Sequence, residues 1–169
     1  SCLPASWHNT PNKIAPAIKS RIQKNKGEFD KIFVLYGDCG TGGKLDEVLR
    51  SESIERIPGP HCYEFFMGRS DFLETHNEEP GCFYLTDYLA RNFDRLIIKG
   101  LGIDKYPELR DEYFKNYKKL VYIAQIDDRN LQRKAAKAAE RLGLEFHLKL
   151  RNYGDLPKYL EKFVSGKDS

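Results

Sequence analysis

Two patterns of apolar residues alternate along the chain. In one, apolar residues recur every three or four positions, and in the other they form short continuous runs. In the N-terminal third, apolar positions three and four residues apart predict helices over residues 11–26 and 44–50. Short, continuous apolar runs predict buried strands over residues 31–36 and 54–58. The aromatic-rich stretch that follows predicts two further helices, of which the second covers residues 70–77.

The rest of the chain repeats this alternation more regularly. A short extended piece after Gly81 leads into a helix that ends near Asn92. The remaining predicted elements are strands over 95–99, 120–126 and 144–150, and helices over 107–118, 128–142 and 157–163. Strands that alternate with helices of this length predict an α/β fold. The expected form is a three-layer, Rossmann-like, mostly parallel sheet with helices on both faces.

One stretch has an echo later in the chain. The segment FDKIFVLYGDCG at 29–40 is similar to FDRLIIKGLGID at 93–104, because both place an aliphatic run between Phe-Asp-basic and glycines. This similarity predicts two pseudo-repeated halves, each with a strand that ends at the same edge of the sheet. Residues 1–169 are expected to form a single α/β domain that lacks an N-terminal strand–helix unit.

Composition narrows the possible partners. The chain has 169 residues, 40% of them hydrophobic and 31% charged, and its longest apolar runs are too short to cross a bilayer. The net charge of +3 is mild, and the basic residues are not interleaved with aromatics, so neither nucleic acid nor membrane is an expected partner. A small-molecule ligand is expected instead. Four cysteines without an export signal predict reduced thiols and a cytoplasmic protein.

The stretch YGDCGTGGKLDEVL, residues 36–49, places a glycine-rich loop between a strand and a helix. It fits neither of two common phosphate-binding templates, since Gly43 and Leu45 stand where a P-loop and a dinucleotide fingerprint need other residues. The backbone N–H groups of four loop residues nevertheless predict an anion site at the start of the helix. These residues are Gly40, Thr41, Gly42 and Gly43. The alternative is a tight turn and nothing more.

Cys39 lies in the middle of this loop. A thiol near a helix N-terminus is stabilised as the thiolate, which favours a catalytic nucleophile or a metal ligand. A small apolar filler is the alternative, because cysteine is often buried. The carboxyl ends of parallel strands meet at one edge of a sheet, so Cys39 is expected to lie near the next loop along, residues 58–62.

That next loop carries His61 and Cys62 in the stretch IPGPHCYEFFMG. Together with Cys39 they offer two sulfur ligands and one nitrogen ligand, a set that suits zinc with one open position, with iron less favoured. The alternative is a structural histidine. Glu64 is a second catalytic candidate as an acid or base, although a carboxylate in the first turn of a helix also stabilises the helix dipole.

Other histidines and cysteines have weaker patterns. His8 lies in CLPASWHN, which is expected to be irregular chain, and a surface cap is preferred over a role in lining a pocket. Cys82 could add a fourth ligand, but a turn before a core strand is the preferred interpretation.

Three segments in order, YGDCGTGG, IPGPHCYEFFMG and PGCFYLTDYL, resemble the bacterial and archaeal family catalogued as domain of unknown function 1638. The resemblance extends through YFKNYKKLVYIAQ and RLGLEF. The family pattern also has a strand and a helix ahead of LPASWHN. Its members are often encoded near corrinoid-dependent methyl-transfer proteins, which implies a role in one-carbon metabolism and corrinoid methyltransferase proteins as partners.

Three functions are therefore open. The first is a zinc- or thiol-dependent protein that assists methyl-group transfer through Cys39, His61 and Cys62 at the C-terminal edge of the sheet. The second is a metal-free module that binds a small anion or a nucleotide. The third is an assembly partner of a corrinoid methyltransferase system. No cobalamin is expected on this chain, because no histidine lies in a DxHxxG motif. Whether the protein is an enzyme stays open.

Overall fold

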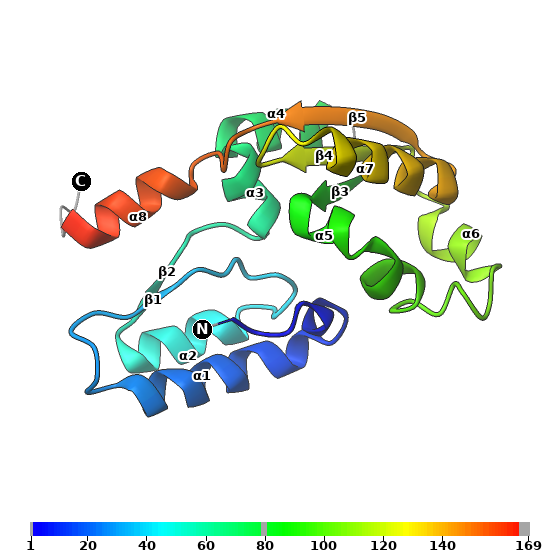
Figure 1. Cartoon of the computed structure of the whole chain (residues 1–169). Helices are drawn as coiled ribbons and strands as arrows, with labels where there is room; N and C mark the ends of the chain where they lie inside the picture. The colour runs from blue at the N-terminus through cyan, green and yellow to red at the C-terminus, as the bar shows by residue number, and fades with distance from the viewer. Residues whose placement is uncertain (1, 79–80, 166–169) are drawn as a thin grey trace. The chain divides into compact units, whose positions relative to one another are not determined.

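The computed structural model describes residues 2–78 and 81–165, and the chain divides into two compact units (Figure 1). The N-terminal unit consists of residues Ser1–Cys62 together with the C-terminal segment that begins at Tyr159. The sheet unit is Tyr63–Lys158. Each unit has its own core and is described by itself. Within the described ranges, no helix combines the length and the apolar character that crossing a bilayer requires.

The N-terminal unit packs two helices beside a pair of short parallel strands. Its elements are η1 Ala5–Asn9, η2 Pro11–Lys13, α1 Ile14–Asn25, β1 Phe33–Val34, α2 Lys44–Glu52 and β2 Glu55–Arg56. Buried residues one turn apart on α1, at positions 14, 18 and 22, face Leu45 and Leu49 of α2 in one apolar cluster. Strands β1 and β2 pair in parallel, so that loops 37–43 and 57–61 leave the same edge.

The sheet unit contains the regular part of the fold. Its elements are α3 Cys62–Met67, α4 Arg69–Glu78, β3 Cys82–Thr86, α5 Asp87–Arg91, η3 Asp94–Ile98, α6 Leu109–Phe114, β4 Lys119–Ala124, α7 Arg129–Leu142, β5 Glu145–Leu150 and α8 Leu156–Ser165. Helix α3 begins at the last residue of the N-terminal unit, and the last turns of α8 belong to that unit. Strands β3, β4 and β5 are adjacent in that order and all parallel.

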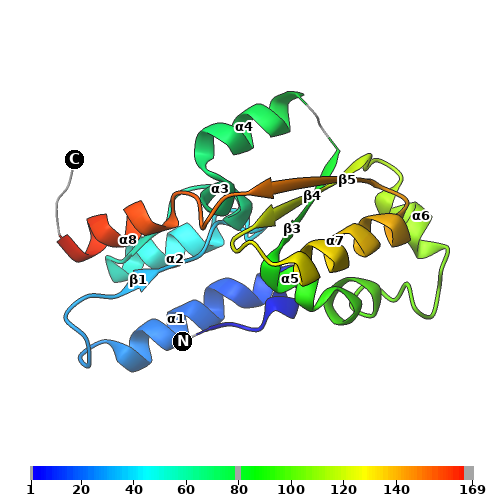
Figure 2. The ribbon, with the colours of Figure 1, turned by 45° about the horizontal axis from the view of Figure 1, so that its top comes forward.

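The central strand β4 is buried on both faces. Leu120, Tyr122 and Ala124 point to the face covered by α5 and α7, whereas Val121 and Ile123 pack with apolar residues of α3 and α4. Figure 2 shows α4 and α7 on opposite sides of these strands. A fully apolar strand of this kind needs cover on both faces, as parallel sheets generally do.

The α/β class is confirmed, with two small parallel sheets in place of one continuous sheet. The predicted strand over 95–99 is wrong, because these residues form the π-helix η3. Leu96 and Ile98 are buried there, and a short apolar run does not distinguish a strand from a buried helix. The echo between 29–40 and 93–104 therefore does not produce two similar halves.

A buried carboxylate joins the carboxyl ends of β3 and β4. Asp87 Oδ1 accepts hydrogen bonds from the Tyr122 hydroxyl at 2.8 Å and from Gln125 N at 3.1 Å. The Asp87 N–H donates to Gln125 Oε1 at 3.0 Å. Burial, and next the hydrogen bond to Asp87, raise the pKa of Tyr122, so the tyrosine stays protonated and is a donor at neutral pH.

Replacing Tyr122 with phenylalanine should lower the free energy of unfolding of the sheet unit by about 2 kcal/mol, because a buried carboxylate loses a donor. Urea unfolding followed by far-UV circular dichroism measures this change. Tyr106→Phe is the matched control, since Tyr106 is exposed and should change stability by less than about 0.5 kcal/mol. Equal stabilities of the two variants would show that the Tyr122 hydroxyl contributes nothing.

Candidate metal site

Three potential metal ligands converge in the N-terminal unit. One ligand atom each from His8, Cys39 and Cys62 lies within 4.8 Å of the other two. His8 belongs to η1, Cys39 to the loop that follows β1, and Cys62 begins α3. The three residues come from segments well apart in the chain, so the group exists only in the folded protein.

Backbone hydrogen bonds hold the two cysteine-bearing loops together. The Cys39 N–H donates to Pro60 O at 2.8 Å, and the Asp38 N–H donates to Gly59 O at 3.2 Å. Both bonds join the loop that follows β1 to the loop that follows β2. The relative position of the two loops is therefore set by the backbone.

The loops approach so closely that a side chain would not fit between them. A Cβ atom on Gly37 would lie 2.9 Å from the backbone carbon of His61, which is closer than real Cβ contacts. Arg56 also holds the loop after β2. Its guanidinium donates to both oxygens of the Asp46 carboxylate of α2, at 2.6 and 2.9 Å, and to Gly59 O at 3.1 Å. A bidentate arginine–carboxylate pair of this kind stabilises the fold and also restricts the orientation of the two side chains.

Cys39 has an unusual backbone conformation. Its φ of 48° lies in the left-handed region, which costs a non-glycine residue about 1 kcal/mol or more. The hydrogen bond from its own N–H to Pro60 O holds this conformation in place. Strained backbone conformations cluster at functional sites, where the surrounding structure maintains them.

His8 is oriented by two neighbours. Its Nδ1 lies 3.0 Å from Ala5 O, so Nδ1 carries a proton, and Nε2 is the nitrogen that can bind a metal ion once it is deprotonated. Its ring stacks on Tyr36, with centroids 5.6 Å apart and planes at 21°. A ligand histidine usually donates its second N–H to a carbonyl or carboxylate in this way, which fixes its tautomer.

The charges in the group favour a thiolate. The pKa of Cys39 is lowered to about 5, first by a hydrogen bond from the Cys62 thiol and then by bonds from His8 and from the Cys62 N–H, which together outweigh burial. The hydrogen bond with Cys39 raises the pKa of His8 above its ordinary value, against the effect of burial. Burial, and next the two sulfurs, raise the pKa of Tyr36, which remains a neutral phenol.

The spacing of the three ligand atoms is close to that of a tetrahedral site. Bond lengths of about 2.3 Å to sulfur and 2.1 Å to nitrogen put the ligand atoms of a tetrahedral zinc site about 3.7 Å apart. Separations within 4.8 Å need only small side-chain rotations to reach that value. Three protein ligands leave a fourth position for water or substrate, which is the arrangement of catalytic zinc.

The structure brings together two of the three predicted ligands, and the histidine is a different one. Both histidines are exposed, but only His8 has a ring nitrogen close to the two sulfurs, while the backbone of His61 lies against Gly37. His8 is therefore a candidate ligand that the sequence did not favour. The aromatic partner of His8, Tyr36, gives little sign in the sequence that the N-terminal segment folds back over the loop.

The predicted anion site already contains an anion from the chain itself. The N–H groups of Gly42 and Gly43 donate to the two oxygens of Asp38 at 3.1 and 3.0 Å, and the Thr41 hydroxyl also donates to Asp38. The Gly40 N–H has no bond of this kind among the described residues. The donors of Thr41, Gly42 and Gly43 thus converge on Asp38, and binding of an external anion by Gly40, Thr41, Gly42 and Gly43 stays a prediction.

Replacing Asp38 with asparagine should lower the stability of the N-terminal unit by about 1 kcal/mol at pH 7, because an amide oxygen accepts weaker hydrogen bonds from Thr41, Gly42 and Gly43 than a carboxylate does. Burial raises the pKa of Asp38, but the bonds from Thr41, Gly43 and Gly42 outweigh it and hold the pKa below its ordinary value. The stabilisation is therefore complete above about pH 4 and is lost as the pH falls through the lowered pKa.

Urea unfolding followed by the fluorescence of Trp7, the single tryptophan, tests this at pH 7 and pH 3. The difference between the wild type and Asp38→Asn should shrink at pH 3. Asp46, whose pKa is lowered by its hydrogen bond with Arg56, contributes to both proteins and cancels. A difference that is independent of pH would show that the Asp38 charge has no role.

Glu64, the second catalytic candidate, belongs to the sheet unit. Only 4% of the residue is exposed, and its Oε1 lies 3.4 Å from Nη1 of the exposed Arg69. Its Oε2 accepts no hydrogen bond within the described part of the chain. Its role as an acid or base stays a prediction. Cys82 begins β3 in the sheet unit and packs in that core, as the preferred interpretation expected.

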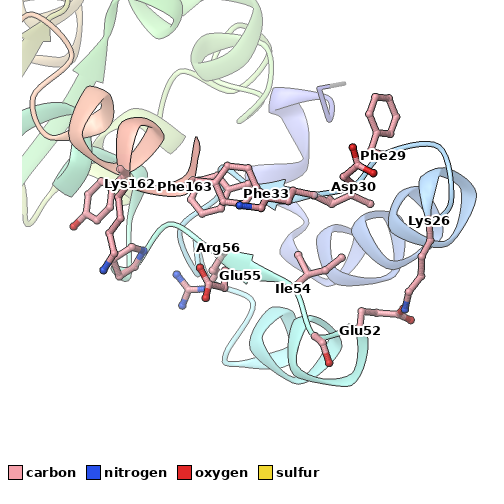
Figure 3. A pocket seen from close by; sticks show the side chains of 15 residues that line it. Lys26, Phe29, Asp30, Phe33, Glu52, Ile54, Glu55, Arg56, Lys162 and Phe163 are labelled. Carbon is pink, nitrogen blue, oxygen red and sulfur yellow. The ribbon is translucent and has the colours of Figure 1, made fainter. Parts of the chain in front are cut away.

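A separate groove of about 590 Å³ lies at the amino ends of β1 and β2. Figure 3 shows the ring of Phe163 from α8 beside Phe33, and their centroids are 4.7 Å apart. Both signs of charge line the groove. The charged residues are Lys26, Asp30, Lys31, Glu52, Glu55, Arg56 and Lys162. This mixture does not select an anion, so the groove gives no support to the nucleotide-binding alternative.

One protein-family model matches the chain. It covers residues 2–160, and its description reads "Protein of unknown function (DUF1638)". No curated protein matches the chain, and no solved structure does.

Proposed function

Because the chain belongs to the DUF1638 family, whose function is unknown, its chemistry has to be argued from its own residues, and we propose that it is a zinc protein that assists methyl transfer to a thiol. His8, Cys39 and Cys62 hold the ion, and its fourth position takes the thiol. The observation that supports this most strongly is the convergence of the three ligand atoms within 4.8 Å, in loops held by backbone hydrogen bonds.

The ligand types favour zinc over the alternatives. Two thiolates and one imidazole are soft and borderline ligands, which exclude magnesium and calcium as natural occupants. Two thiolates also balance the charge of a divalent ion in a half-buried site. Iron binds the same ligand types and is the less favoured alternative.

Methyl transfer is the reaction that best uses such a site. Zinc held by His8, Cys39 and Cys62 would supply Lewis acidity, which would lower the pKa of a nearby thiol and release its proton to solvent. The sulfur of that thiol would then form a bond to the methyl carbon as the bond between that carbon and the donor breaks. The electron pair of the broken bond leaves with the donor. His8 keeps its position throughout through its bond to Ala5 O.

The methyl donor in this proposal is a methylated corrinoid carried by another protein. This part rests on the resemblance of the chain to a family encoded near corrinoid methyl-transfer proteins. We place the reaction in the cytoplasm, where cysteine ligands stay reduced.

Metal analysis of protein purified without an affinity tag tests the proposal. We expect close to one zinc per chain in the wild type, and loss of zinc in Cys39→Ser and Cys62→Ser. Cys2→Ser and Cys82→Ser are matched controls that should keep the metal, since neither residue is in the ligand group. Cobalt(II) substitution adds a direct readout, because thiolate ligands give intense charge-transfer absorption.

Wild-type protein that is purified without metal and that cannot be loaded with zinc or iron would refute the proposal. A protein that binds zinc is then assayed with free methylcobalamin and simple thiols, with the Cys39→Ser variant as the inactive reference. Equal methylation of thiols by the wild type and this variant would retain the metal site and reject the reaction.

A further inference from the structure

We propose that Cys39 and Cys62 form a reversible disulfide in the presence of a hydroperoxide, and that this bond switches off metal binding. The inference rests on the proposed metal site, because the two sulfurs concerned are two of its three ligands. It adds a regulatory property that the metal site alone does not imply.

The two sulfurs already lie in contact range. They are within 4.8 Å of each other, and both the thiol and the backbone N–H of Cys62 donate hydrogen bonds to the Cys39 sulfur. A disulfide requires about 2.05 Å between sulfurs, which rotation of two cysteine side chains can supply when the backbones are close. The Cys39 N–H bond to Pro60 O at 2.8 Å keeps these backbones close.

The remaining cysteines do not compete for the same partner. Cys2 is exposed near the start of the chain, Cys82 begins β3 of the sheet unit, and neither sulfur belongs to the ligand group. Cys62 is half-buried, so a small oxidant reaches this sulfur more readily than that of Cys39. The structure therefore predicts one specific disulfide rather than a mixture.

The reaction consumes one hydroperoxide. The sulfur of one cysteine attacks the terminal oxygen, the O–O bond breaks, and this cysteine becomes a sulfenic acid as water or alcohol leaves. The second thiol then attacks the sulfenic sulfur, so that an S–S bond forms and water leaves. In total, two thiols are oxidised and the peroxide bond is reduced. A dithiol reductant reverses the oxidation by thiol–disulfide exchange.

The disulfide removes two of the three ligands at once. A thiolate is a strong zinc ligand, whereas a sulfur in a disulfide is not. His8 alone remains, and a single imidazole does not retain zinc against a chelator. The oxidised protein is therefore expected to be free of metal, and the reduced protein to bind it again.

The experiment treats zinc-loaded, full-length protein with hydrogen peroxide in the presence of a chromophoric zinc indicator. Released zinc and lost thiols are followed together, and peptide mapping identifies the linked cysteines. We expect release of the bound zinc, a Cys39–Cys62 cross-linked peptide, an intact mass lower by two hydrogen atoms, and full recovery on reduction.

His8→Gln is the control that separates the two proposals, since it keeps both thiols and removes a metal ligand. It should form the same disulfide although it binds no zinc. Cys2→Ser should behave as the wild type does. A wild type that holds zinc but yields sulfinic acids, or links other cysteines, would reject the switch and leave the metal site standing. If the wild type never binds zinc, the metal-site proposal is wrong. The proposed control of metal binding is then wrong as well, even if the disulfide forms.

Discussion

Replacing His8 with alanine should weaken zinc binding by more than about 100-fold, whereas replacing His61 with alanine should leave zinc affinity unchanged. Loss of a residue that only orients a ligand already costs about 10- to 100-fold in metal affinity, so loss of a ligand should cost more. His61 lies in the loop 57–61, directly before Cys62, but it does not belong to the ligand group. The two variants thus test the structure against the simpler interpretation of the sequence.

Competition with a chromophoric chelator measures both affinities. Trp7, which precedes His8, reports by its fluorescence whether the N-terminal segment stays folded in each variant. Tyr36→Phe adds a graded comparison, because it keeps the ring that stacks on His8 and removes the hydroxyl 3.4 Å from Nε2. If His61→Ala loses zinc and His8→Ala does not, the ligand assignment made from the structure is incorrect.

Replacing Gly154 with alanine should destabilise the sheet unit by at least about 3 kcal/mol, through backbone strain and overpacking together. Gly154 has a φ of 54°, and a Cβ atom there would lie 2.5 Å from Phe65 O and 2.6 Å from Phe66 O. The same turn is tied to the helix by the Asp155 N–H, which donates to Phe65 O at 2.8 Å. The loop after β5 therefore cannot accept a side chain without moving away from α3.

Gly143→Ala is the matched control for this variant. Gly143 has a φ of 73°, and a Cβ atom on it would meet nothing within 4 Å. Its cost should be the left-handed strain alone, about 1 to 2 kcal/mol. Urea unfolding of both variants, followed by circular dichroism, isolates the steric part as the difference. Equal destabilisation would mean that the loop gives way and that the close approach at Gly154 is not a constraint.

The elements that could be predicted from the sequence are those whose signals are local. Helix α7 is strongly amphipathic and is capped at both ends. Asp128 accepts hydrogen bonds from Asn130 N and Leu131 N at its N-terminus, and Gly143 ends it in the left-handed conformation. The stretch 95–99 carries only an apolar run. Whether such a run becomes a strand or a buried helix depends on where the core lies, which no local pattern contains.

The same distinction applies to the site. Cys39 and Cys62 could be expected to lie close together because parallel strands bring their following loops to one edge. His8 could not, because its place depends on stacking against Tyr36, a contact between segments far apart in the chain. Asp38 did leave a usable signal. An aspartate shortly before a run of glycines is well placed to accept hydrogen bonds from their N–H groups, as Asp38 does from Gly42 and Gly43.

The division of the chain into units also bears on the order of synthesis. All three candidate ligands precede residue 63, so the complete set is synthesised before any of the sheet unit is. Translation adds about 5 to 20 residues each second, and the first units of a chain fold while the later ones are still being made. If these residues bind a metal, the nascent N-terminal segment offers all three of them seconds before α8 emerges and its last turns join the same unit. In a cell short of zinc, the nascent chain would therefore compete for the metal before its synthesis is complete.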